Sequence, residues 1–258
     1  MNEGEHSKIS ISESEAQEIE STYNDLLKRL KGLSGKTDTE TGSEAISDLT
    51  YFIIERLSFE DQPLLLYTSK IFDEYYIFAH SLNVCLISIR IGLRLNFDKE
   101  RLKDLGFLAL THAGKDMGFP EELLKRIGHD KEMDEIMRLA DVYDAMTHPP
   151  TYRHAMIPRE TLESIIDSNG FFNRRLIKIL LEELGLYPKG SWVQLSNKQI
   201  GKVISANKAL PLRPTVKVFI DWQGNYLKEA KIIDLSKDSA IHVLRPLTGE
   251  EIKHIRGS

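Results

Sequence analysis

Three side chains that bind metal ions well stand at core-facing positions of three different predicted helices: His80, His112 and Asp141. Each continues an apolar stripe at helical spacing, as His80 does with Val84 and Ile87. A buried carboxylate without a partner is costly, so Asp141 needs a metal ion or a histidine beside it. The three residues together predict a site that could hold one divalent metal ion with open positions.

An ordinary structural interpretation stands beside this one. A single histidine on an apolar helix face is usually a core residue with a hydrogen-bonding partner. An aspartate late in a helix can likewise bond to a neighbouring hydroxyl. Three such residues on three helices favour a functional site, but spacing alone leaves both interpretations open.

The elements that must position these residues are helices. Periodicity and capping residues predict helices at about 12–33, 44–57, 70–95, 98–112, 131–146, 158–168 and 171–185, with a helical turn at 121–126. The stretch 70–95 is apolar nearly all round, which is typical of a buried central helix. After Pro188, about five short runs rich in β-branched residues are separated by turn signals. We therefore expect a mainly α protein, with a helical bundle followed by a small all-β module.

Three parts follow from this pattern: an N-terminal tail and helix at 1–40, a helical domain at 41–187 and the β module at 188–258. The N-terminal helix could pack on the domain or pair with a second copy as a short coiled coil in a homodimer. In the β module, Trp192 and Trp222 are expected to fill the core, although they could form a ligand platform.

The composition narrows the class of protein. The net charge of −5 argues against a binder of duplex nucleic acid, but not against a small anionic ligand. The single cysteine, Cys85, indicates a reducing, cytoplasmic compartment. No run of about 18 apolar residues predicts a membrane span.

Two segments resemble the core of the HD-GYP domain, a branch of the HD phosphohydrolases. They are AHSLNVCLISIRIGLRLNFDKERLKDLGFLALTHAGKDMGFPEELL and MRLADVYDAMTHPPTYRHAM. The stretch from Tyr187-Pro188 to Leu244 resembles a β segment that often follows such domains, so the match covers about 70–245. The resemblance implies an HD-type helical bundle, metal-dependent hydrolysis of cyclic di-GMP, and iron or manganese as the metal.

The chain departs from the family pattern at the motif histidine. An alignment through Gly118-Phe119-Pro120 places His112 on that histidine and Ala113 on the following aspartate, which is expected to bridge two metals in an active site. An alternative alignment fixes Gly114-Lys115 on the family's Gly-Lys and places Thr111 and His112 on the pair. Either way the His-Asp pair is broken.

A second departure is a missing segment. Between Leu124 and Met133 the family carries several dozen residues with further histidine ligands and the Gly-Tyr-Pro loop, but here only KRIGHDKE intervenes. His129 and Asp130 form an adjacent pair, and we expect Asp130 to be a helix cap. Tyr76 occupies the position that is a glutamate ligand in some family members.

These departures favour a catalytically impaired HD-GYP-like protein, acting as a regulatory, sensing or scaffold unit in cyclic di-GMP signalling. The alternative is a phosphodiesterase with one metal on His80, His112 and Asp141 and with Lys115 near the phosphate. A third hypothesis is a module that binds the cyclic dinucleotide through arginines such as Arg153 or Arg213. Whether the protein is an enzyme stays open at this point.

Two further carboxylates bear on these hypotheses. Asp116 follows His112 by four residues and would replace the lost ligand only if the helix continued through Gly114. We interpret Asp144 as structural, bonding to a loop near Thr147 or Arg153, with a role as a second ligand as the alternative.

Overall fold

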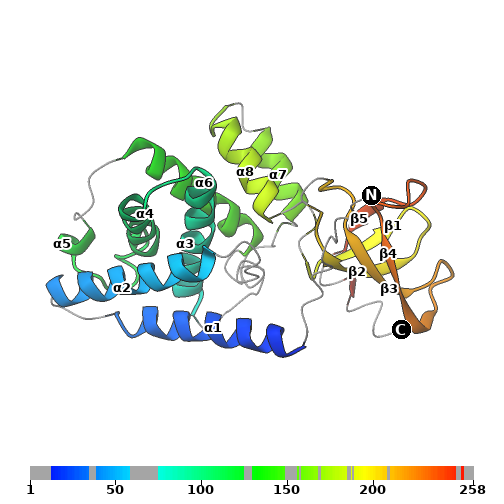
Figure 1. Ribbon diagram of the computed structural model, residues 1–258, viewed down its shortest axis with the longest axis horizontal. Helices are drawn as coiled ribbons and strands as arrows, with labels where there is room; N and C mark the ends of the chain where they lie inside the picture. Colours follow the sequence, from blue (N-terminus) through cyan, green and yellow to red (C-terminus); the bar gives the residue numbers. More distant parts are fainter. Residues whose placement is uncertain are drawn as a thin grey trace, which may run out of the picture. The chain divides into compact units, whose positions relative to one another are not determined.

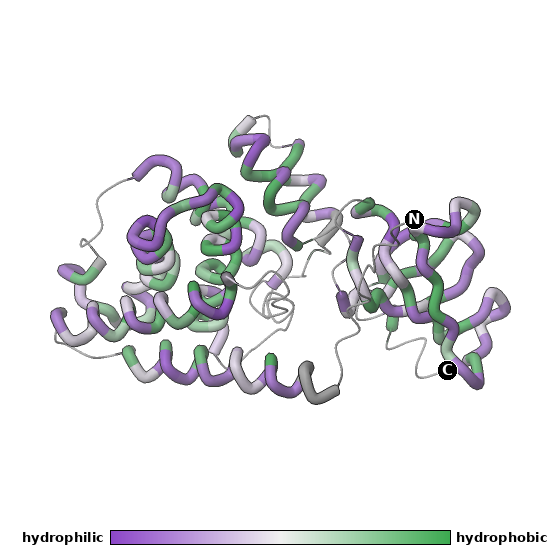
Figure 2. The backbone as a smooth tube through the Cα atoms, viewed as in Figure 1, coloured by the Kyte–Doolittle hydropathy of each residue, from purple (hydrophilic) through white to green (hydrophobic). Residues whose placement is uncertain are grey.

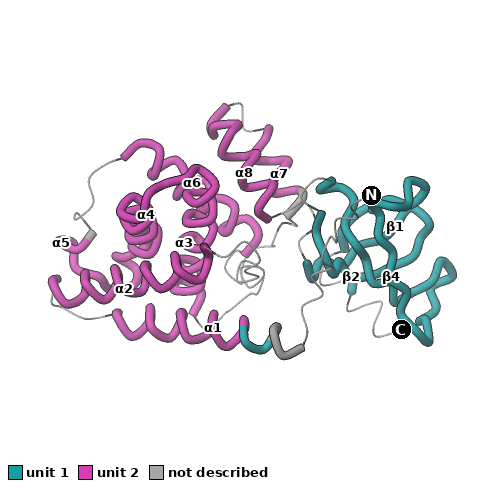
Figure 3. Tube along the Cα trace, in the orientation of Figure 1, with its two compact units in different colours: residues 1–18, 185–258 teal, residues 19–184 magenta. Residues whose placement is uncertain are grey.

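The computed structural model describes residues 13–34, 39–58, 75–124, 130–148, 156, 158–167, 170–184, 187, 189–207, 210–247 and 251–252. These residues form a mainly helical chain followed by a small antiparallel sheet, as the sequence predicts (Figure 1). They divide into two compact units, residues 19–184 and residues 1–18 with 185–258 (Figure 3). The start of the predicted helix at 70 lies outside the described residues, as do Arg126, His129 and Arg153.

The helices are α1 (Glu13–Lys31), α2 (Thr39–Leu57), α3 (Tyr76–Arg94), α4 (Lys99–Thr111), α5 (Glu121–Leu124), α6 (Lys131–Thr147), α7 (Pro158–Ile166) and α8 (Arg174–Leu184). Helix α2 begins five residues before the predicted start at 44. Its first turns are fixed by burial of Ser43 and Ile46, which overrides the weak helix propensity of the Thr-, Gly- and Ser-rich segment.

Helix α3 is the central helix of the helical unit. Thirteen of its residues are buried, and α2, α4, α6 and α8 pack around it. Figure 2 shows the green, apolar stretches of these helices in the interior of the unit. By length and composition α3 could cross a membrane, but 78% of its apolar window is buried inside the unit, as in a core helix.

Close backbone packing holds α4 against its neighbours. A side chain at Gly106 would overlap the Thr50 methyl group of α2 and would lie 2.9 Å from the Ile89 Cδ1 atom of α3. Asp98 caps α4 by accepting from the Arg101 amide, and Asp130 caps α6 by accepting from the Glu132 and Met133 amides. The predicted cap at Asp130 is confirmed, and the two caps fix where α4 and α6 begin.

Helix α1 packs on the helical domain. Tyr23, Leu26 and Leu30 are fully buried, so its apolar stripe is not exposed for pairing with a second copy. Self-association through another surface stays a prediction.

The β module consists of β1 (Trp192–Leu195), β2 (Ile200–Ser205), β3 (Thr215–Ile220), β4 (Tyr226–Asp234) and β5 (Val243–Pro246). All neighbours pair antiparallel in the order β4-β3-β2-β1-β5. Its core consists of Tyr187, Val193, Leu195, Val203, Val216, Val218, Ile233, Leu235 and Val243.

One expectation for this module needs correction, and another stays untested. Trp222 does not fill the core, because it lies in the β3–β4 turn and is 64% exposed, whereas Trp192 is half-buried against Phe219. Arg213 is half-buried, and its Nη1 atom donates to the carbonyls of Asp238 and Ile241 at 2.9 and 3.0 Å; its role as a ligand for a cyclic dinucleotide stays a prediction. These bonds hold the turn after β4 in place.

Candidate metal centre

The structure brings together the three metal-capable side chains that the sequence singles out. His80 comes from the second turn of α3, His112 directly follows α4, and Asp141 lies in the middle of α6. One ligand atom from each lies within 4.8 Å of the other two. The remaining question is whether these atoms fit a single ion.

The separations of the three ligand atoms match one metal ion. His80 Nε2 lies 3.0 Å from Asp141 Oδ1 and 3.2 Å from His112 Nε2, and His112 Nε2 lies 3.8 Å from Asp141 Oδ1. Three atoms with these separations lie on a circle of about 2 Å radius, which is the usual length of a metal–nitrogen or metal–oxygen bond. Two histidines and one carboxylate form a donor set suited to iron, manganese or zinc, and they leave other coordination positions open.

Hydrogen bonds on the other ring nitrogens fix both tautomers. His112 Nδ1 donates to the Ala109 carbonyl at 2.7 Å, because a carbonyl can only accept. His80 Nδ1 donates to Asp144 Oδ2 at 2.8 Å. Each histidine therefore directs its Nε2 atom toward the other ligands, the arrangement usual for metal-binding histidines.

Charge in the cluster favours binding of a cation. Burial lowers the pKa of His80, but the hydrogen bonds to Asp141 and Asp144 outweigh it and raise the pKa to about 9. Burial and the nearby charge of His80 lower the pKa of His112, against its bond to Ala109. The hydrogen bond from His80 lowers the pKa of Asp141. Without metal, one extra proton thus resides on His80, and an ion that binds Nε2 must displace it.

Asp144 is the partner that orients His80, a role that sequence reasoning missed. It is fully buried, and its carboxylate accepts from His80, from Asn83 Nδ2 at 2.9 Å and from His148 Nδ1 at 3.0 Å. The expected bond to the loop near Thr147 is met by His148, the residue directly after Thr147, whereas Arg153 lies outside the described residues. Asp144 lies one turn after Asp141, which was the only sequence signal for this role.

The described residues directly after His112, in the turn that follows α4, add no further ligand to the group. Helix α4 ends at Thr111 and the chain turns at Gly114, whose amide donates to the Thr111 carbonyl at 2.8 Å. Asp116 and Lys115 are exposed on this turn, and among the described residues Asp116 is not part of the metal-capable group. The expectation that Gly114 would prevent Asp116 from replacing the lost ligand agrees with this geometry.

The site is open on one side. The Asp141 side chain is 37% exposed, whereas the His80 and His112 side chains are 8% and 13% exposed. Tyr76 lies parallel to the His80 ring at a centroid distance of 5.8 Å and an angle of 7°, so it covers a face of the ring and not its Nε2 edge. A small ligand would therefore approach past Asp141.

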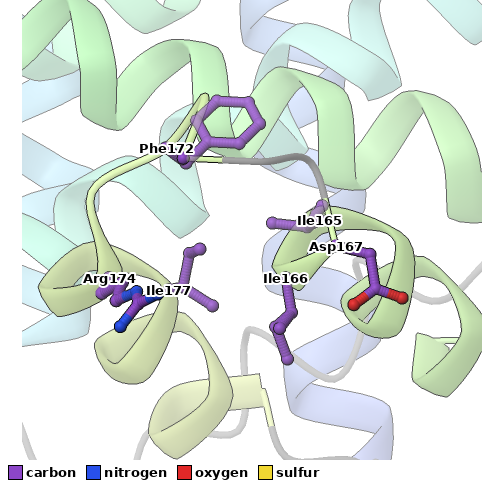
Figure 4. A pocket seen from close by; sticks show the side chains of 7 residues that line it. Ile165, Ile166, Asp167, Phe172, Arg174 and Ile177 are labelled. Atoms are coloured by element: carbon purple, nitrogen blue, oxygen red, sulfur yellow. The ribbon is translucent and has the colours of Figure 1, made fainter.

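A separate pocket of about 430 Å³ lies between α7 and α8. In Figure 4 the side chains of the two helices face one another across it, with Asp167 and Arg174 on opposite sides. None of its lining residues belongs to the metal-capable group.

Comparisons with known proteins agree with this architecture. Residues 192–255 match the family described as a KOW domain associated with HD domain. A cyclic di-GMP phosphodiesterase of Pseudomonas aeruginosa is 21% identical over 254 residues, which cover 78% of this chain and 60% of that relative. The chain thus spans less than two thirds of the relative's length. No solved structure matches significantly.

Three observations agree. Two histidines and an aspartate from three helices form the cluster, residues 192–255 match a module associated with HD domains, and a distant relative is named as a cyclic di-GMP phosphodiesterase. These findings support an HD-domain protein.

Proposed function

We propose that this HD-domain protein is a catalytically impaired, HD-GYP-like unit that binds one divalent metal ion and acts as a regulatory or sensing component in cyclic di-GMP signalling. The observation that carries the proposal is the pairing of two features at one place. Three ligand atoms are spaced for one ion, while Ala113 directly follows His112 where the family pattern has a metal-bridging aspartate.

The donor set supports one ion and argues against two. A bound ion would supply Lewis acidity toward a phosphoryl oxygen and lower the pKa of bound water. His80, His112 and Asp141 would hold that ion, and Asp144 would keep the His80 ring in place. A second ion needs a bridging carboxylate. The Ala113 methyl group cannot serve, and no other described carboxylate joins the group.

Within the alignment, this chain has fewer residues than its relative. The alignment extends over 254 residues, more than the 78% of this chain that it covers, so this chain lacks residues that the relative carries. The short KRIGHDKE segment between Leu124 and Met133 is a natural place for such a gap. The absence of a segment that carries metal ligands in the family supports impaired catalysis. The single cysteine, which is buried, fits a cytoplasmic location.

The test combines metal analysis with two assays on cyclic di-GMP. We expect one iron or manganese ion per chain, lost in His112→Ala and retained in the control His242→Ala, which changes an exposed histidine of the β module. Calorimetry should detect cyclic di-GMP binding, whereas hydrolysis should stay at the level of the buffer. Robust hydrolysis that His112→Ala abolishes would refute the impaired state.

A second candidate is a phosphohydrolase that works with one metal ion. The exposed edge of Asp141 and the open coordination positions favour it, because substrate can reach the ion from that side. Lys115, exposed on the turn after α4, would contact the phosphate. Manganese-dependent cleavage of a simple phosphodiester, reduced by Lys115→Ala, would support this candidate over the first.

A further inference from the structure

A buried chain of hydrogen bonds connects helix α1 to the metal-capable histidine of α3. The Tyr23 hydroxyl donates to Asn83 Oδ1 at 2.7 Å, and Asn83 Nδ2 donates to Asp144 Oδ1 at 2.9 Å. The other oxygen of Asp144 accepts from His80 Nδ1 at 2.8 Å. These hydrogen bonds join α1, α3 and α6, and each links residues that are 60 or more positions apart in the sequence.

Each link in this chain has a defined direction. Burial and the nearby Asp144 carboxylate raise the pKa of the Tyr23 phenol, so its hydroxyl is a proton donor. An amide that accepts at Oδ1 must present its Nδ2 atom on the other side, and there it meets the carboxylate. The Tyr23 bond therefore sets the orientation of Asn83, and Asn83 helps to hold Asp144.

The hydroxyl of Tyr23 is not explained by packing. Tyr23 is as fully buried as Leu26 and Leu30 on the same helix, and a phenylalanine would fill the same volume. A buried hydroxyl costs stability unless it has a partner, and here its partner leads to the metal-capable site.

We propose that Tyr23 and Asn83 are positioning residues for His80, and that they couple the docking of helix α1 to metal affinity at the site. The proposal rests on the metal site of the proposed function. If α1 moves away, Asn83 loses the bond that orients it, Asp144 loses a fixed donor, and the His80 ring is held less firmly. By reciprocity, a bound ion makes α1 more firmly docked.

The first experiment measures metal affinity by competition with a chelating dye. Tyr23→Phe should lower the affinity about tenfold, the lower end of the effect of changing residues behind a metal ligand. The matched control is Leu26→Val, which shortens an equally buried α1 side chain outside the hydrogen-bond chain and should leave the affinity unchanged.

A double-variant comparison separates positioning from general destabilisation. Because Tyr23 acts through Asn83, Tyr23→Phe should add nothing further to Asn83→Leu. Fully additive losses, or an equal loss in Leu26→Val, would overturn the positioning role. In amide hydrogen exchange, metal should protect α1 in the wild type, and that gain should shrink in Tyr23→Phe.

A second measurement needs no metal. In the metal-free protein, the nitrogen-15 NMR signal of His80 Nδ1 should show a slowly exchanging proton that exchanges faster in Tyr23→Phe and not in Leu26→Val. An unchanged His80 signal would refute the inference even if the wild type binds metal. A wild type that binds no ion would instead refute the proposed function, and the NMR comparison would still decide the positioning role.

Discussion

Removing either of two aspartates one turn apart on α6 should have different effects, one on stability and the other on metal binding. Asp144 is fully buried and accepts three side-chain hydrogen bonds, whereas Asp141 is 37% exposed and faces the open side of the cluster. We expect Asp144→Ala to damage the fold of the helical unit, and Asp141→Ala to remove metal binding with little loss of stability.

The magnitudes follow from what each substitution leaves behind. Asp144→Ala strands donors of His80, Asn83 and His148 in a buried site, and breaking a buried pair on one side costs about 3–5 kcal/mol. Asp141→Ala removes one hydrogen bond from His80 at a position that water reaches, which costs about 1 kcal/mol. The difference between the two variants should therefore be about 3 kcal/mol.

The assay is urea unfolding in the presence of a chelator, followed by the helical circular dichroism signal. The midpoint of Asp144→Ala should fall far below that of Asp141→Ala, which should stay near the wild-type midpoint. Metal analysis without chelator should show separately that Asp141→Ala has lost its ion. If the two variants unfold at the same urea concentration, the assignment of Asp144 as the buried anchor of His80 is wrong.

Three further predictions concern the packing of Gly106, the cap of α6 and the effect of a bound ion on stability. Gly106→Val should destabilise the helical unit by about 1–3 kcal/mol in urea unfolding, because the added side chain overlaps Thr50 and crowds Ile89; a loss below about 0.5 kcal/mol would contradict the close α2–α4 packing. Asp130→Ala should cost about 1 kcal/mol, since it removes the cap of α6. The Met133 amide and Arg101 lower the pKa of Asp130, so this contribution is complete above pH 3.8 and is lost as the pH falls through the lower folded-state value; an equal loss at pH 2 and pH 7 would contradict it. A divalent ion at 100 times its dissociation constant should stabilise the protein by about 2.7 kcal/mol, seen as a rise in melting temperature that chelator reverses.

The helical layout was predictable because it depends on periodicity. The stretch around α3 is apolar on nearly every face, which predicts a helix surrounded by others, and four helices do pack on it. The start of α2 was missed because its Thr-, Gly- and Ser-rich first turns have weak local preference and are held by burial. Trp222 was misplaced because a large aromatic residue predicts a core position only on average, and this one lies in an exposed turn.

The sequence also predicts the three candidate metal ligands better than it predicts the residues that hydrogen-bond to them. Helical spacing shows that His80, His112 and Asp141 face the core, and three core-facing metal-capable groups have few ways to be satisfied except by one another. Spacing shows only the local partner of Asp144, because His148 lies four residues after it at the end of α6. The partners His80 and Asn83 lie on α3, and those contacts exist only after the helices pack. Tyr23 illustrates the point further, since one hydroxyl in an ordinary apolar stripe bonds to a residue 60 positions away. In this chain the face that gathers the metal-capable groups can therefore be predicted from the sequence, whereas the hydrogen bonds behind those groups follow only from the packed structure.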